Sequence, residues 1–137
     1  MSNCLDIKIN NKICELNDVK VKLKLASTNW NIPDSISYSI ELSIEEMVSN
    51  IIYYGFSDNQ NHEIKIKLEK SKDQLRVVID DEGTRFNPID YEIQKDPFLD
   101  QISLGGLGIL LTKELMDNID YKRIGNTNKL TMIKKLK

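Results

Sequence analysis

One segment with helical periodicity carries a carboxylate and an amide at a spacing that suits metal binding and proton transfer. Glu46 and Asn50 stand four residues apart, and residues at that spacing share one face of a helix. The amide oxygen could be a ligand of Mg²⁺, which prefers oxygen donors and keeps several waters. The carboxylate could orient a hydroxyl group or a water molecule. Many exposed helices contain such a pair, so the spacing alone is not specific.

A second candidate follows a dense β-branched run, Leu75–Ile79, which predicts a central strand. The run leads into Asp80, Asp81, Glu82 and Gly83. A carboxylate at a strand end can accept a hydrogen bond from a ligand amino group, and the glycine beside it permits close approach. Aspartate and glycine are also common in plain turns, so that alternative stays open here.

Three glycines in four residues, within Leu104–Ile109, open an apolar helix. Exposed backbone N–H groups and the positive end of the helix would suit a phosphate. No Gly-Lys-Ser/Thr follows, so this is not the Walker sequence, and the strand that precedes the glycines in a dinucleotide fold is missing. The alternative is a flexible hinge in front of a helix.

In this order and at this spacing, the three groups resemble the GHKL (histidine kinase-like) ATPase superfamily, which includes DNA gyrase, histidine kinases and MutL and has the Bergerat-type ATP fold. Its N box, first glycine box and second glycine box match Glu46-x-x-x-Asn50, Asp81-x-Gly83 and Gly106-x-Gly108. Within the superfamily the chain looks most like the bacterial anti-sigma factor and serine-protein kinase family. The likeness covers nearly the whole chain and includes the closing strand at 128–131.

The resemblance implies a role for each matching residue. Asn50 would coordinate Mg²⁺, and Glu46 would be the general base that activates the attacking hydroxyl group, which demands hydrogen-bond reach. Asp81 would accept a hydrogen bond from the adenine amino group, and Gly83 would make room for the ring.

The phosphates of ATP would lie on Gly106 and Gly108, and residues 87–104 would form a lid over the nucleotide. Phosphoryl transfer needs mostly positioning and charge neutralisation, which such parts supply. Gly105 reads as a lid hinge at the edge of the site. The other nucleotide contacts that the resemblance implies are Phe86, Gly105, Leu107 and Thr131.

Three positions depart from the family pattern or leave a choice. Arg85 stands where the wider superfamily has a second glycine, which the anti-sigma family often lacks too. Tyr54 stands where many members carry a histidine before the glycine that follows the N box. Glu45 offers a second carboxylate beside Glu46, and the spacing to Asn50 favours Glu46 as the base.

The elements that must position these residues follow from periodicity. Alternating polarity predicts a strand over 5–10, and helical spacing predicts a helix over about 15–30. Pro33 ends this helix, and Asp34 or Ser35 can cap the next one.

The second helix is expected to run to about Tyr54, before Gly55. Its polar stripe consists of Ser39, Ser43, Glu46 and Asn50. This stripe lies roughly opposite the centre of the apolar face, so it is either a solvated face or the polar wall of a cavity.

The rest of the chain predicts two hairpins separated by a long loop and a helix. The expected ranges are strands at 62–69 and 75–79, a loop over 84–104, a helix over 107–117, and strands at 119–124 and 128–136. Strands and helices segregate instead of alternating. The expected fold is therefore α+β, a two-layer sandwich with helices on one face of a mainly antiparallel mixed sheet, in a single domain over 1–137.

Composition excludes several classes of function. With 137 residues, 40% hydrophobic and 29% charged, the chain is expected to be globular. Its net charge of −2 provides no overall positive field that would attract nucleic acid. Neither Cys4 nor Cys14 has a second cysteine or a histidine close to it in the sequence, so a zinc site is not expected. A Ser-His-Asp hydrolase would need the single histidine, His62, as its base, so this class is weakly supported. No signal peptide or membrane span is visible, which favours the cytoplasm.

The leading hypothesis is an ATP- and Mg²⁺-dependent serine/threonine-protein kinase that acts as an anti-sigma factor or partner-switching regulator. Its substrate would be a small anti-sigma antagonist protein, and it could also hold a sigma factor or another regulator. The rival is a nucleotide-dependent binding protein without phosphotransfer. A histidine kinase is disfavoured, because no dimerisation helix with a phosphoacceptor histidine precedes the domain. Homodimers are common among similar proteins, so self-association stays open.

Overall fold

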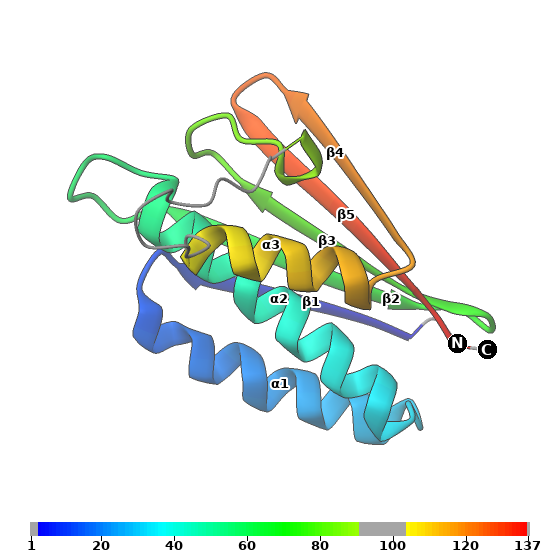
Figure 1. The fold of residues 1–137 in the computed structure, drawn as a ribbon. Helices are drawn as coiled ribbons and strands as arrows, with labels where there is room; N and C mark the ends of the chain where they lie inside the picture. The colour runs from blue at the N-terminus through cyan, green and yellow to red at the C-terminus, as the bar shows by residue number, and fades with distance from the viewer. Residues whose placement is uncertain (1–2, 91–103, 137) are drawn as a thin grey trace.

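Three helices cover one face of a five-stranded sheet (Figure 1). The structure is a computed structural model that describes residues 3–90 and 104–136. Its elements are β1 (Asn3–Asn10), α1 (Leu16–Asn29), α2 (Asp34–Tyr54), β2 (Glu63–Lys70), β3 (Gln74–Asp81), α3 (Leu104–Leu115), β4 (Asn118–Ile124) and β5 (Thr127–Lys135), with 3-10 turns at Ile13–Glu15 and Pro88–Asp90. The strand order is β1-β2-β3-β5-β4, and every neighbouring pair is antiparallel. The expected α+β sandwich is confirmed.

The helix-facing side of the sheet consists of rows of side chains that run across the strands. Because side chains alternate between the two faces of a strand, one row per two residues faces the helices. Strand pairing defines two apolar rows, which are Leu5–Leu68–Val77–Met132–Ile119 and Ile7–Ile66–Ile79–Leu130–Tyr121. The third row, nearer the C-terminal end of β3, begins as Ile9 and Ile64 and then becomes polar. This change in polarity positions the candidate site.

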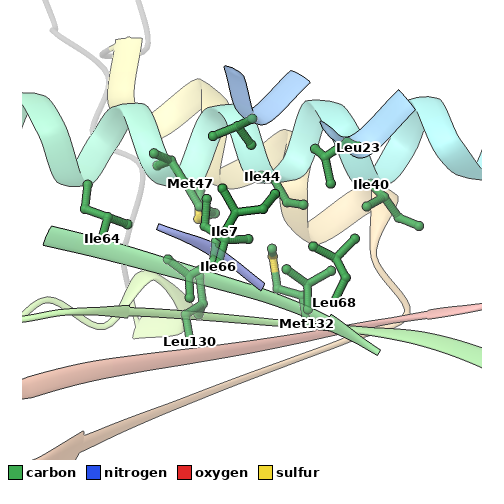
Figure 2. Close-up of a cluster of buried hydrophobic side chains, with 14 of the residues drawn as sticks. Ile7, Leu23, Ile40, Ile44, Met47, Ile64, Ile66, Leu68, Leu130 and Met132 are labelled. Carbon is green, nitrogen blue, oxygen red and sulfur yellow. The ribbon is translucent and has the colours of Figure 1, made fainter. Parts of the chain in front are cut away.

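Helix α2 is the central helix and provides most of the helical side of the core. Figure 2 shows Ile40, Ile44 and Met47 pointing from α2 toward the side chains of β2 and β5. Ile44 and Val48 are completely buried. Since α2 packs against both α1 and α3, one helix fixes the positions of the other two.

The polar stripe of α2 does not face solvent. Ser39 and Ser43 are buried, and Gly108 of α3 lies against Glu46 of the same stripe. At Glu46 the stripe therefore packs against α3. The alternative of a solvated face is excluded for this part of α2.

Two predicted helix boundaries are wrong. Neither Asp34 nor Ser35 caps α2, because both lie inside the helix and Pro33 is the N-cap. Proline can end one element and start the next here, since its carbonyl accepts a hydrogen bond from the amide of Ser37 (2.9 Å).

The segment 105–108 is part of α3 and not a loop in front of it, because α3 begins at Leu104. Glycine disfavours helix by about 1 kcal/mol relative to alanine. Packing overrides that preference here, since Ile109, Thr112 and Met116 are all buried.

No helix within residues 3–90 or 104–136 combines the length and the apolar character that crossing a bilayer requires.

Candidate functional site

The polar end of the third row lies at the base of a cavity. In that row Asp81 of β3 pairs with Asn128 of β5, which pairs with Arg123 of β4. The cavity above them has a volume of about 400 Å³. Its lining residues are Met47, Asn50, Ile51, Tyr54, Gly55, Asp81, Thr84, Arg85, Phe86, Pro88, Ile109, Tyr121, Asn128 and Leu130. A mostly apolar hollow with a few convergent polar groups is the usual form of a small-molecule site.

Asp81 is the carboxylate at the base of this cavity, and only 5% of it is exposed. The backbone amide of Gly83 (2.8 Å) and the side-chain amide of Asn128 (3.0 Å) both donate to its Oδ1. Among the described residues these donors share one oxygen, which leaves Oδ2 for a ligand. Burial raises the pKa of Asp81, while the two hydrogen bonds and the charge of Arg123 act in the opposite direction.

The turn after β3 is built so closely that it requires glycine at position 83. A Cβ atom on Gly83 would lie 2.7 Å from the carbonyl oxygen of Gly55 and 2.8 Å from Oδ1 of Asp81. The amide of Thr84 donates to that same Gly55 carbonyl (2.8 Å), and Arg123 donates to the carbonyl of Gly83 (2.8 Å). The turn is thus held between the end of α2 and the edge strand β4.

Asn50 lines the cavity from α2, and its Nδ2 is buried without a hydrogen-bond partner among the described residues. A buried amide without a partner costs about 1–3 kcal/mol, so this group is suited to a ligand. No cluster of three or more His, Cys, Asp or Glu side chains that could hold a metal occurs in the described part of the chain. Mg²⁺ nevertheless fits the site, because Mg²⁺ in phosphate sites needs only one or two protein oxygens besides phosphate and water.

The two adjacent glutamates on α2 point to different places. A Cβ atom on Gly108 would lie 3.1 Å from Cδ of Glu46 and even closer to its Oε2, so this carboxylate lies against α3. Glu45 is exposed and lines a separate cavity of about 240 Å³ between α1 and α2. Only Glu46 shares the α3-facing stripe with Asn50.

The remaining predicted contacts divide into two groups. Phe86 lines the cavity and is 44% exposed. Gly105, Gly106 and Leu107 lie in the first turns of α3, where Gly106 is buried and Leu107 is 51% exposed. Most of the expected lid, 87–104, falls outside the described residues.

Thr131 is not brought to the cavity. Along β5 the side chains of Asn128, Leu130 and Met132 face the helices and are buried, so Thr131 points to the opposite face of the sheet. Asn128, which the sequence analysis did not single out for chemistry, lies in the cavity instead, together with Tyr121 of β4. The alternation of β5 contains the signal that separates position 128 from position 131.

The histidine has a local structural role. The ring of His62 stacks on Phe56, with ring centroids 4.1 Å apart, and its Nε2 is 2.7 Å from Oδ1 of Asp58. It does not line either cavity described above. Both cysteines are exposed and unpaired.

Two curated relatives of the chain are named serine-protein kinases. The serine-protein kinase RsbW of Bacillus subtilis (strain 168) is 28% identical in an alignment 98 residues long that covers 68% of this chain and 59% of that protein. RsbW of Staphylococcus aureus (strain JH9) is 34% identical in an alignment 101 residues long that covers 66% of this chain and 62% of that protein. The chain thus spans less than two thirds of the length of these relatives.

Solved structures share the fold. The RsbU and RsbW domains of Rv1364c from Mycobacterium tuberculosis match with a TM-score of 0.71 and 15% identity, over 97% of this chain and 32% of that one. The histidine kinase domain of the Erythrobacter litoralis EL346 blue-light activated histidine kinase matches with a TM-score of 0.59 and 16% identity, over 90% of this chain and 60% of that one. The histidine kinase-like ATPase domain family matches residues 16–134. The chain belongs to this family of histidine kinase-like ATPase domains.

Proposed function

We propose that the domain binds ATP in the cavity above Asp81 and transfers its γ-phosphoryl group to a serine or threonine of a partner protein. The observation that carries the proposal is that one cavity holds both Asp81, a buried residue whose Oδ2 accepts no hydrogen bond from the described residues, and the unpartnered Nδ2 of Asn50. The amino group of adenine could donate a hydrogen bond to Oδ2 of Asp81. The relatives named serine-protein kinase support the type of reaction.

The chain's own groups can perform the transfer. Asn50 would hold Mg²⁺ through its amide oxygen, and Mg²⁺ when bound supplies charge neutralisation at the phosphates. Glu46, one turn away on the same stripe, would accept the proton of the attacking hydroxyl group. A new bond would form between that oxygen and the γ-phosphorus, the bond to the bridging oxygen would break, and ADP would leave. Backbone N–H groups in the first turn of α3 would bind the phosphates.

The proposed partner is a small anti-sigma antagonist protein as substrate, with a sigma factor or another regulator as a second partner. The relatives' name, serine-protein kinase, supports a protein substrate.

The test compares two adjacent carboxylates. Incubation with labelled ATP, Mg²⁺ and candidate antagonists encoded near this protein should give phosphorylated antagonist. Glu46→Gln should lower the transfer rate by at least about 100-fold, the lower end of the range for loss of a general base, while ATP affinity stays within about threefold. Glu45→Gln is the matched control and should keep the wild-type rate.

Tight ATP binding without transfer to any candidate antagonist would overturn the kinase proposal. It would favour the rival, a nucleotide-dependent binding protein. Equal losses in the two glutamine variants would remove Glu46 from the role of base.

A further inference from the structure

Tyr121 on the edge strand β4 is linked to Asp81 by hydrogen bonds through Asn128. The hydroxyl group of Tyr121 donates to Oδ1 of Asn128. Nδ2 of Asn128 donates to Oδ1 of Asp81 at 3.0 Å and to the carbonyl of Thr84 at 3.0 Å, with the Gly83 carbonyl at 3.3 Å. Asn128 is 6% exposed, so water does not readily replace these partners.

The orientation of the Asn128 amide decides which oxygen of Asp81 is available. An asparagine amide has an acceptor end and a donor end of nearly the same shape. Two carbonyls and a carboxylate surround the donor end, and the tyrosine hydroxyl satisfies the acceptor end. Without that hydroxyl the buried Oδ1 of Asn128 loses its donor, and the amide is less firmly held.

We propose that Tyr121 is a positioning residue for base recognition. Its hydroxyl group holds the Asn128 amide so that Oδ1 of Asp81 is occupied and Oδ2 faces the 6-amino group of adenine. This inference rests on the proposed nucleotide site and adds a specificity determinant on β4, which lies at the edge of the sheet.

The charged groups around Asp81 remain the same when only the Tyr121 hydroxyl is removed. Arg123 lowers the pKa of Asp81, and Asp80 raises it. The hydrogen bond from Asn128 lowers it as well. Weakening that bond therefore raises the pKa of Asp81 further, which gives the proposal a second, independent readout.

The experiment measures the affinity of the full chain for two nucleotides by calorimetry. ADP carries the 6-amino group, and purine riboside 5′-diphosphate lacks it. Tyr121→Phe should weaken ADP binding about fivefold, the usual effect of one neutral hydrogen bond, and leave the affinity for purine riboside 5′-diphosphate unchanged. The matched control is Tyr38→Phe on α2, where the tyrosine is 65% exposed; it should change neither affinity.

Equal weakening of both nucleotides would overturn the proposal, because a general loss of structure does not discriminate between them. Unchanged binding of both would overturn it too. A protein that binds ADP but transfers no phosphate would refute the kinase function alone and leave this inference intact.

The pKa of Asp81 can be measured without any nucleotide, from the pH dependence of its side-chain carboxyl carbon in NMR spectra. Tyr121→Phe should raise that pKa relative to wild type, and Tyr38→Phe should not. An unchanged pKa of Asp81 in Tyr121→Phe would contradict the proposed positioning of Asn128 by Tyr121, even in a protein that fails to bind ADP.

Discussion

At the residue scale, Asp81 determines the polarity of the cavity. It is a buried carboxylate in a mostly apolar hollow, and burial raises its pKa. The folded state therefore binds this proton more tightly than the unfolded chain. The resulting contribution to stability is complete below the ordinary pKa of an aspartate and is lost as the pH rises through the raised pKa of the folded state. The proposed nucleotide binding should have the opposite dependence, because the ionised form is the stronger acceptor.

We therefore expect ADP affinity to fall as the pH is lowered through the raised pKa of Asp81. Asp81→Asn should lower the affinity at neutral pH by about 10- to 100-fold, the range for a hydrogen bond to a charged group, and should flatten the pH dependence. Calorimetry over a pH series that begins near the ordinary pKa of an aspartate, about 3.9, and ends above neutrality measures both effects.

The neighbouring carboxylate provides the control for that measurement. Asp80 faces the other side of the sheet, 3.2 Å from the amino group of Lys129. Asp80→Asn should keep the wild-type affinity at neutral pH and should still show a pH dependence, moved to lower pH because the charge of Asp80 raises the pKa of Asp81. Unchanged affinity in Asp81→Asn would refute the assigned adenine contact.

At the element scale, the contact between α2 and α3 joins the proposed base to the proposed phosphate end of the site. Gly108 allows α3 to approach the side chain of Glu46 closely. Thr112, one turn later, is buried and donates to the carbonyl of Gly108 (2.9 Å). The same contact that packs the helices thus restricts the position of the Glu46 carboxylate.

Gly108→Ala should separate stability from activity. Alanine favours helix by about 1 kcal/mol over glycine, and the displaced group is the flexible end of a side chain, so thermal unfolding should shift by only a few degrees, roughly the 2–4 °C expected per kcal/mol. Phosphotransfer should fall at least about tenfold, because a displacement near 1 Å at a reacting group can cost 100-fold.

Leu110→Ala is the control on the same helix, since Leu110 is 37% exposed and does not line the cavity. It should retain activity. Full activity in Gly108→Ala would show that the Glu46 carboxylate is not restricted by this contact.

At the scale of the whole molecule, one core holds the layers together. The apolar rows of the sheet and the buried face of α2 pack into a continuous cluster (Figure 2). Ile44 lies at its centre with no exposed surface. The site occupies the edge of this cluster, where the third row changes from isoleucine to Asp81 and Asn128.

Ile44→Ala should reduce the free energy of unfolding by about 2–5 kcal/mol, the range for truncating a buried isoleucine. Urea denaturation of the purified chain measures this. Leu25→Ala on α1 is the control, because Leu25 is 60% exposed, and it should change stability by no more than about 0.5 kcal/mol. Similar losses in the two variants would contradict the placement of the core.

The sequence by itself determined the elements and most of the motif positions. Alternation identified the faces of the strands, and helical spacing identified the buried face of α2, because these periods come from backbone geometry. The resemblance carried by the motifs at Glu46, Asn50, Asp81, Gly83, Gly106 and Gly108 predicts a nucleotide site.

Only the tertiary structure decided which neighbour covers each face. The polar stripe of α2 packs on α3, and the glycines at 105–108 are helical. The neighbours of Asn128 were decided by strand register, which places it between Asp81 and Arg123. A local sequence pattern shows whether a side chain is polar or apolar. Its contact partner depends on how elements that are distant in the sequence pack together.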